Sequence, residues 1–183
     1  MPLIPVLKTL SLNTPIIIDS KSGVSGAGKK AHIDYTYCQL NENFSAYKVG
    51  RKHQHIPEIE KYLKKWSLKT THIIFTAHLL PINRGILSTL YLPQVSEEQY
   101  MLAQKALLDF YQNELFVKVF SHKLPQIKDV AYTNQCHIGF SYDKTNQTFI
   151  LISVIDNLLK GASGQAVQNM NLMLGFKEEE GLC

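Results

Sequence analysis

The sequence predicts an α+β fold, and three observations support this prediction. Three apolar runs have the length and composition of buried strands: Pro15–Asp19, His72–His78 and Gly85–Leu92. Cys136–Tyr142 and Phe149–Ile155, joined by a polar turn, are typical of a β-hairpin. Ser96–Gln99 is a capping box that opens a helix to about Gln112. With about six or seven strands, about four helices and more hairpins than β-α-β units, the sheet is expected to be largely antiparallel.

The remaining elements complete a single domain over residues 1–183. Residues 1–9 have the pattern of the end of an apolar helix whose beginning is absent, and residues 57–66 predict another helix. Val117–Phe120 predicts a short strand. A last helix is expected to begin at Asp156 and to stop at Gly175, a usual C-cap residue. No repeat, low-complexity segment or linker divides the chain.

The composition excludes several classes of protein. The chain is 45% hydrophobic and 19% charged, and its net charge of +4 is mild for 183 residues. No basic run is interleaved with aromatic residues, so nucleic acid is not expected as a partner. No apolar run reaches the roughly 20 residues that span a membrane. Three cysteines are too few for a disulfide framework, and we expect a reduced, cytoplasmic protein.

His53 and His55 stand two residues apart, just before a helix that starts at Pro57. In an extended stretch, both imidazoles would lie on one side. Glu58 and Glu60 are expected to face the positive end of the helix, where backbone N–H groups also attract anions. The pattern indicates a place to move a proton beside a negatively charged substrate group. A plain surface loop is the alternative, and a metal site is not expected because a third ligand at suitable spacing is missing.

Three further segments carry small or basic residues that a ligand can approach. Ser20–Lys30 is rich in glycine and offers hydroxyls and lysines to an anion, but it lacks the nucleotide P-loop pattern. Arg84 stands in a turn, and its guanidinium suits carboxylate or phosphate. Small residues crowd 161–166, where a backbone or a planar ligand can come close. A flexible turn, a solvated arginine and tight helix packing are the corresponding structural alternatives.

Together these blocks resemble N-acetyl-γ-glutamyl-phosphate reductase of arginine biosynthesis, in its C-terminal catalytic and dimerisation domain. They follow one another in family order over nearly the whole chain: DSKSGVSGAG (19–28), ENFSAY (42–47), HQHIPEI (53–59), FTAHLLPINRG (75–85) and DNLLKGASGQAVQNMN (156–171). The resemblance implies a fold like the C-terminal domain of glyceraldehyde-3-phosphate dehydrogenase. Its mostly antiparallel mixed sheet carries helices on one face, and the other face serves subunit contact. A dimer or tetramer is therefore expected.

The resemblance also implies the chemistry. The family reduces an acyl phosphate to a semialdehyde with NADPH: a cysteine thiolate forms a thioester, hydride reduces it, and a histidine acts as acid and base. Carried over by motif, His53 is that histidine. The substrate-binding residues implied are Ser22, Ser25, Tyr47, His55 and Arg84. The residues implied on the nicotinamide side of NADP are Gly26, Asn157, Gly161 and Gln165.

The sequence departs from the family pattern in two ways. The nucleophile block Pro-Gly-Cys-Tyr-Pro-Thr and the nucleotide-binding Rossmann half, both expected upstream of Met1, are absent. None of Cys38, Cys136 and Cys183 has the context of the nucleophile. We therefore expect this chain alone to be inactive, and its C-terminal helix, about residues 161–174, to pack on the missing Rossmann domain. The smaller departure is Ala77, which stands where the family has proline.

Three other functions remain possible at this point. The same architecture serves aspartate-semialdehyde dehydrogenase, although the His53–Glu58 block argues against that enzyme. A non-catalytic dimerisation or binding module would leave His53 with an ordinary imidazole pKa. A cysteine–histidine hydrolase would pair Cys38 with His53, but no activating signature surrounds Cys38.

Overall fold

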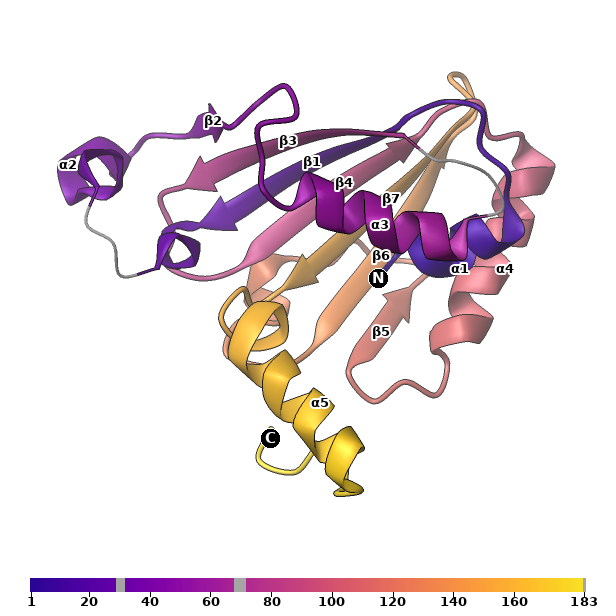
Figure 1. The fold of residues 1–183 in the computed structure, drawn as a ribbon. Coiled ribbons are helices and arrows are strands. Elements are labelled where there is room, and N and C mark those ends of the chain that lie inside the picture. Colours follow the sequence, from indigo (N-terminus) through magenta and orange to yellow (C-terminus); the bar gives the residue numbers. More distant parts are fainter. Residues whose placement is uncertain (29–31, 68–71, 183) are drawn as a thin grey trace.

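The computed structural model describes residues 1–28, 32–67 and 72–182, and its centre is a seven-stranded mixed sheet in the order β2-β3-β1-β4-β7-β6-β5. Figure 1 shows the strands as a fan with helices at its front and sides. The strands are β1 Ile16–Gly23, β2 Ser45–Tyr47, β3 Ile73–Leu80, β4 Ile86–Leu92, β5 Val117–Phe120, β6 Cys136–Asp143 and β7 Thr148–Ile155. The helices are α1 Leu3–Thr9, α2 Tyr37–Leu40, α3 Ile56–Trp66, α4 Glu97–Tyr111 and α5 Gly164–Leu174.

Most neighbouring strands in the sheet are antiparallel. The pairs β1–β4, β2–β3, β4–β7 and β6–β7 are antiparallel, whereas β1–β3 and β5–β6 are parallel. The hairpin over β6 and β7 was predicted, and its register runs from Cys136 opposite Ile155 to Asp143 opposite Thr148. The predicted α+β class and mostly antiparallel mixed sheet are thus confirmed.

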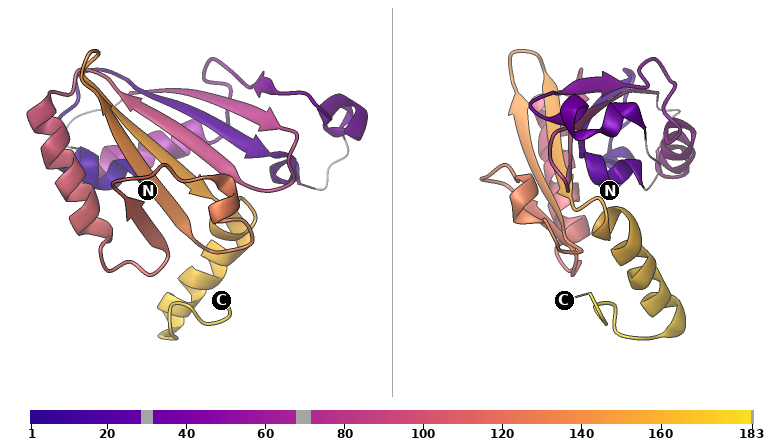
Figure 2. Two further views of the ribbon diagram at one scale, coloured as in Figure 1. Left: turned by 180° about the vertical axis from the view of Figure 1, so that it is seen from behind. Right: turned by 90° about the vertical axis from the view of Figure 1, so that its left-hand side faces the viewer.

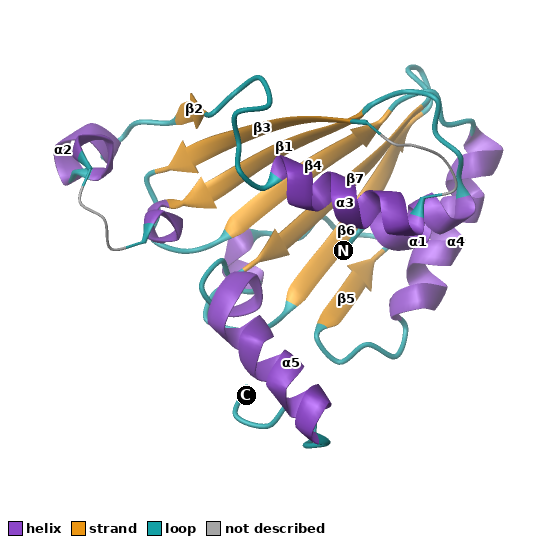
Figure 3. Cartoon of the chain, viewed as in Figure 1, coloured by secondary structure: helices purple, strands orange, loops and turns teal. Residues whose placement is uncertain are grey.

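Helices α1, α3 and α4 cover one face of the sheet, as Figures 1 and 2 show together. Alternate residues of each strand point to this face, and one row across the sheet is Phe75, Ile18, Leu90, Leu151 and Phe140. Leu7 of α1 and Leu107 of α4 are fully buried against it. Helix α5 extends away from the sheet beyond this layer (Figure 3). The core therefore lies between one helical layer and one sheet face.

The opposite face carries no helix over β1, β3 and β4 in the part of the chain that the structure describes. Its side chains include Ile17 and Ile74, which are 38% and 53% exposed. Over β6 the chain returns close to the sheet, because a Cβ on Gly139 would lie 2.6 Å from Pro125 Cδ. None of the described helices is long and apolar enough to cross a membrane.

Local sequence signals placed several elements correctly. The Ser96–Gln99 capping box is present, with Gln99 N–H donating to Ser96 Oγ at 3.2 Å. Gly175 closes α5 at φ 73°. Pro57 lies in the first turn of α3.

Other boundaries were wrong. Strand β1 continues to Gly23, because Ser20, Lys21 and Ser22 pair with both β3 and β4. Asp156 does not begin the last helix; its carboxylate instead accepts the N–H groups of Leu158 and Leu159, ahead of a π-helical turn over Leu159–Ser163. Strand β2 and the short α2 were not predicted. Lys29 and Lys30 of the glycine-rich stretch, and Cys183, lie outside the described residues.

Candidate functional site

His53 lies in the segment between β2 and α3 and is 7% exposed. Its ring is surrounded by three aromatic rings, with centroids 5.6 Å away for Tyr47, 5.1 Å for His55 and 4.9 Å for Phe75. Tyr47 comes from β2 and Phe75 from the helix-covered side of β3. The structure thus brings together three of the predicted site residues: His53, His55 and Tyr47.

The two histidines meet through a turn, so the condition that the stretch be extended is not met. His55 has φ −81° and ψ −10° and serves as the N-cap of α3. Its backbone N–H donates to His53 Nδ1 at 3.3 Å. Since Nδ1 accepts this bond, the neutral ring carries its proton on Nε2. One nitrogen of His53 is occupied by the protein, and Nε2 is the atom available for proton transfer.

An ion pair that was not predicted anchors this segment to α3. Arg51 donates from Nη1 and Nη2 to the two oxygens of Glu60, at 2.9 and 2.8 Å. Arg51 itself adopts φ 67°, next to Gly50 at φ 70°. Glu60 therefore pairs with a side chain rather than facing the helix end, while Glu58 remains in the first turn. No local pattern links two residues nine positions apart across a left-handed turn.

The surroundings of His53 favour its neutral form. Burial lowers the pKa of His53 below its ordinary value, and the nearby charges of His55 and Lys48 lower it further. The Tyr47 hydroxyl keeps its proton, because burial raises its pKa. At neutral pH the cluster therefore presents an uncharged imidazole between aromatic rings.

A second cluster forms where β1, the turn before β4 and the end of β7 meet. Asn157 is buried; its Oδ1 accepts from the Gly85 N–H at 2.7 Å and its Nδ2 donates to Ser25 Oγ at 2.9 Å. Ser25 Oγ donates in turn to the Asn83 carbonyl at 2.6 Å. Gly26 lies alongside, since a Cβ there would be 3.6 Å from Asn157 Nδ2 and 3.4 Å from the Oγ of Ser22.

Arg84 joins this cluster through a buried carboxylate. Its Nη1 donates to Asp156 Oδ2 at 3.1 Å, and its guanidinium lies over the Tyr132 ring, 4.6 Å from the centroid. Burial alone would raise the pKa of Asp156. The effect of burial is outweighed by hydrogen bonds to the carboxylate. They come from the backbone N–H groups of Tyr132, Leu159 and Leu158 and from the Arg84 side chain, and they hold the pKa of Asp156 below its usual range. Asp156 therefore belongs to this cluster, although the sequence predicted for it only the start of a helix.

The last two predicted residues follow on the π-helical turn and α5. A Cβ on Gly161 would lie 3.9 Å from Asn157 Cβ, so Gly161 borders the second cluster. Gln165 donates to Asn169 Oδ1 at 3.0 Å, one turn along α5. The structure therefore brings Ser22, Ser25, Gly26, Arg84, Asn157 and Gly161 together, whereas the hydrogen bond of Gln165 lies within its own helix.

Both clusters lie on one face of the sheet. Ser22 of β1 aligns with Leu79 of β3, and Tyr47 of β2 with Ala77. By the two-residue alternation of strands, these side chains share the face of Phe75, which contacts His53. The histidine cluster thus lies over the middle of β3, at Phe75 and Ala77, and the Asn157 cluster lies farther along on the helical side, at the carboxyl end of β1.

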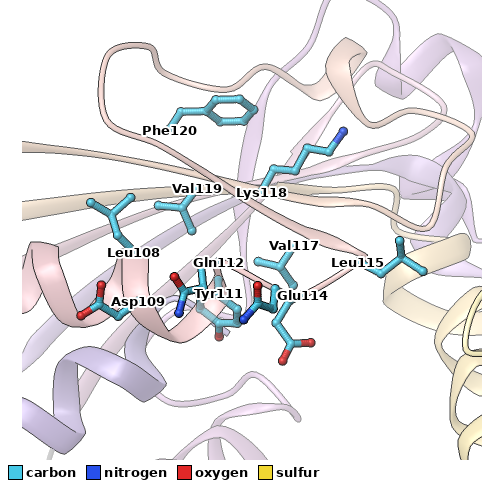
Figure 4. A pocket seen from close by; sticks show the side chains of 11 residues that line it. Leu108, Asp109, Tyr111, Gln112, Glu114, Leu115, Val117, Lys118, Val119 and Phe120 are labelled. Carbon is cyan, nitrogen blue, oxygen red and sulfur yellow. The ribbon is translucent and has the colours of Figure 1, made fainter.

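The hollow in Figure 4 belongs to another part of the molecule. It has a volume of about 690 Å³ and is lined by residues of α4, β5 and the loop between them, including Leu108, Tyr111, Glu114 and Val119. It contains none of the predicted site residues. Among the described residues no three of His, Cys, Asp and Glu are grouped to hold a metal ion. The hydrolase alternative would pair Cys38 with His53. Cys38 is exposed on α2, and the rings that contact His53 are those of Tyr47, His55 and Phe75.

Comparison with known proteins supports the resemblance seen in the sequence. Residues 1–157 match the model of the semialdehyde dehydrogenase dimerisation domain. The chain is 48% identical over 181 residues to N-acetyl-gamma-glutamyl-phosphate reductase of Thermoanaerobacter sp. (strain X514), covering 98% of this chain and 52% of that protein. The reductase of Geotalea daltonii is 47% identical over 182 residues, with coverage of 98% and 53%. The chain spans about half the length of the curated relatives it matches.

Solved structures with a similar fold include aspartate-semialdehyde dehydrogenases. Enzyme II of Vibrio cholerae has a TM-score of 0.69 at 17% identity, and a probable enzyme from Pseudomonas aeruginosa 0.72 at 16%. Each match covers 94% of this chain and 58% of the other. At these identities the likeness shows the fold, while the closer sequence relatives are all named as the reductase. The chain belongs to the semialdehyde dehydrogenase family, through its dimerisation domain.

Proposed function

We propose that this chain is the C-terminal part of an NADP-dependent reductase that converts N-acetyl-γ-glutamyl phosphate to N-acetylglutamate semialdehyde. The observation that carries the proposal is His53, a buried neutral imidazole whose Nδ1 is occupied by the His55 N–H. Such a ring has one free nitrogen of defined protonation, as general acid–base catalysis requires. Relatives at 47–48% identity bear the name of this enzyme.

His53 has two tasks in this reaction. Its Nε2–H donates to the oxygen of the reacting carbonyl as negative charge develops there. The same N–H stabilises that oxygen until the carbon–sulfur bond breaks, the sulfur leaves as thiolate and the carbonyl re-forms. The reactive cysteine lies upstream of this chain. Tyr47 and Phe75 on either side of the ring keep water from the reacting atoms. The lowered pKa of His53 keeps the ring neutral at physiological pH.

The substrate is an anion, and the second cluster supplies neutral and cationic donors for it. Arg84 presents its guanidinium, and His55 and Tyr47 border the reacting end. The hydroxyls of Ser22 and Ser25 donate to the carbonyls of Gly23 and Asn83 in this structure, so each would have to turn from that carbonyl to donate to the substrate. Together they suit a carboxylate and a phosphoryl group held apart on one substrate. We assign the substrate-binding role to these five residues.

The described residues fit the edge of a nicotinamide. NADP, when bound, supplies the hydride. Gly26 and Gly161 leave room for a planar group beside Asn157, since a Cβ on Gly26 would fill the space against Ser22. Gln165 follows on the first turn of α5. The remainder of the cofactor is assigned to the upstream Rossmann half.

Helix α5 is proposed to pack on that upstream half. Its outer end exposes Met170, Leu172, Met173 and Leu174, with Met173 84% exposed. Apolar side chains gathered on one solvated helix end are typical of a contact surface. Since nucleophile and cofactor binding both lie upstream, the 183-residue chain alone should have no reductase activity.

The bare sheet face is proposed as the contact between subunits of a homo-oligomer. It carries apolar side chains such as Ile17, Ile74 and Tyr91, and it lies opposite the candidate site. The only described charges that flank these residues on β1, Asp19 and Lys21, are paired at 2.8 Å. A cytoplasmic location is proposed because Cys38 and Cys136 are free thiols.

The experiment compares this chain with the full-length reductase, formed by adding the coding sequence upstream of Met1. NADP reduction is followed with N-acetylglutamate semialdehyde and phosphate, the reverse reaction. We expect activity only in the full-length protein, and a loss of about 10²- to 10⁴-fold in His53→Ala. The exposed His122→Ala is the matched control and should retain full activity.

Two results would contradict the proposal. A folded but inactive full-length protein would indicate a binding module, and activity with aspartate semialdehyde alone would indicate the related dehydrogenase. Turnover by residues 1–183 alone would refute the assignment of the nucleophile to the upstream part.

A further inference from the structure

Asp156 gathers hydrogen bonds from three separate segments. Its side chain is fully buried. Oδ1 accepts the N–H groups of Leu158 and Leu159 at 2.8 and 3.0 Å, and Oδ2 accepts the Tyr132 N–H at 2.8 Å and Arg84 Nη1 at 3.1 Å. A buried carboxylate is stable only with such compensation, and here an ionised carboxylate is favoured. Asp156 thus fixes Arg84 relative to the end of β7.

Asn157, the next residue, bonds to the backbone of the same turn before β4. Asn157 Oδ1 accepts the Gly85 N–H, so Asp156 takes the Arg84 side chain while Asn157 takes the backbone one residue later. Asn157 also holds Ser25. The two adjacent side chains, Asp156 and Asn157, therefore set the position of Arg84 relative to Ser25. An anion bound between Arg84 and Ser25 would contact both residues at this fixed separation.

Arg84 keeps donors for a ligand in this arrangement. Its one hydrogen bond within the described ranges uses Nη1, and its flat face rests on Tyr132. The side chain is 24% exposed. Nη2 and Nε are therefore left to a ligand, and a guanidinium held by an ion pair and a stacked ring loses less freedom when it binds a carboxylate.

We propose that Asp156 is a positioning residue: it holds Arg84 in the orientation that receives the carboxylate of the substrate. This rests on the proposed function, and it adds a residue that touches no substrate. Asp156 acts through Arg84, so its effect should vanish once Arg84 no longer binds the substrate.

The kinetic test uses the full-length reductase and Asp156→Asn. We expect KM for N-acetylglutamate semialdehyde to rise about 10-fold with kcat changed less than about 3-fold, since the contact is present in both ground and transition states. In the Arg84→Gln background the same substitution should change KM less than about 2-fold. Asp143→Asn is the matched control: Asp143 also accepts N–H bonds in a turn, over β6–β7, and KM should not move.

A second measurement follows the orientation of Arg84 directly. In the 183-residue chain, the Arg84 Nη resonances should be separate, because the bond from Nη1 to Asp156 hinders rotation of the guanidinium, and they should coalesce in Asp156→Asn. If Asp156→Asn does not fold, Tyr132→Leu replaces it, because it removes only an exposed stacking ring. It should raise KM about 3-fold, and this effect too should be absent in Arg84→Gln.

The outcomes separate this inference from the proposed function. The positioning role is overturned if the enzyme is active and neither Asp156→Asn nor Tyr132→Leu changes KM. It is also overturned if either substitution raises KM by the same factor in the Arg84→Gln background as in the wild type. Unchanged Arg84 Nη resonances in a folded Asp156→Asn chain overturn it as well. A full-length protein that is inactive on the semialdehyde while the resonances behave as expected refutes the proposed function and leaves the Asp156–Arg84 coupling intact.

Discussion

Replacing Asn157 with alanine should destabilise the chain by an amount that its contacts determine. The substitution removes the acceptor of the Gly85 N–H and the donor to Ser25 Oγ. Gly85 is buried at φ 113°, and a Cβ there would lie 2.2 Å from Ile127, so its N–H has no room to turn toward water. A buried donor without a partner costs about 1–3 kcal/mol, and the second bond adds about 0.5–1.5 kcal/mol. We expect a loss of about 1.5–4.5 kcal/mol.

The assay is urea unfolding of the 183-residue chain, followed by far-UV circular dichroism. Asn169→Ala is the matched control, because Asn169 is exposed on α5 and accepts one bond from Gln165; its free energy of unfolding should change by less than about 0.5 kcal/mol. Ser25→Ala leaves the Gly85 bond in place and should cost about 1 kcal/mol. Both substitutions remove the Asn157–Ser25 bond, and Ser25→Ala also removes the bond to Asn83, so the amount by which Asn157→Ala costs more is a lower bound on the contribution of the buried Gly85 N–H.

Two results would refute this reasoning. If Asn157→Ala destabilises no more than Asn169→Ala, the turn before β4 does not depend on its side-chain acceptor. If Ser25→Ala costs as much as Asn157→Ala, the Gly85 N–H contributes no more than the Ser25–Asn83 bond and the hydroxyl network carries the effect. Either result would also remove the basis for placing Asn157 at the cofactor edge.

The imidazole of His53 should titrate below its ordinary value of 6.5, since burial and two nearby charges disfavour the protonated ring. The folded chain then binds fewer protons than the unfolded one in this window, so stability falls as the pH drops below about 6.5. Activity of the full-length protein falls only at the lower pH where the folded ring itself becomes protonated. Lys48→Gln should move the resonance titration upward, whereas Lys52→Gln should not. Ile74→Lys should weaken self-association measured by sedimentation, because it charges the bare sheet face. Leu102→Lys, at an equal 53% exposure on α4, should leave association unchanged, and equal effects would contradict the assigned interface.

The fold was predictable wherever the signal is local. The Ser96 capping box, the Gly175 stop and the hairpin over β6 and β7 each depend on neighbours within a few residues, and each is found where predicted. Strand β2 has no such signal. Ser45–Tyr47 is short and exposed, and it is a strand only because β3 lies beside it. Likewise, the composition of 20–23 is that of a loop, yet two flanking strands supply its hydrogen bonds.

In the candidate site, too, the sequence identified residues but not the distant contacts that orient them. Residue types indicated His53 and Arg84 as candidates, because acid–base and anion-binding chemistry need those side chains, and the family resemblance added Asn157. What orients each of them lies far away in the sequence or in the backbone. Asp156 reaches Arg84 over 72 positions and the Tyr132 N–H over 24, and no periodicity links such residues.

The histidine pair makes the physical reason explicit. A period-two stretch would have placed both imidazoles side by side as equals. The turn at Gln54 and His55 makes them unequal, because the His55 backbone N–H occupies one nitrogen of His53 and leaves the other free. Chemistry that needs a single proton donor of fixed tautomer therefore depends on a backbone conformation, and the pair of Arg51 with Glu60 links this segment to α3. A motif can name the residue that transfers the proton, but the direction of transfer is set by these contacts.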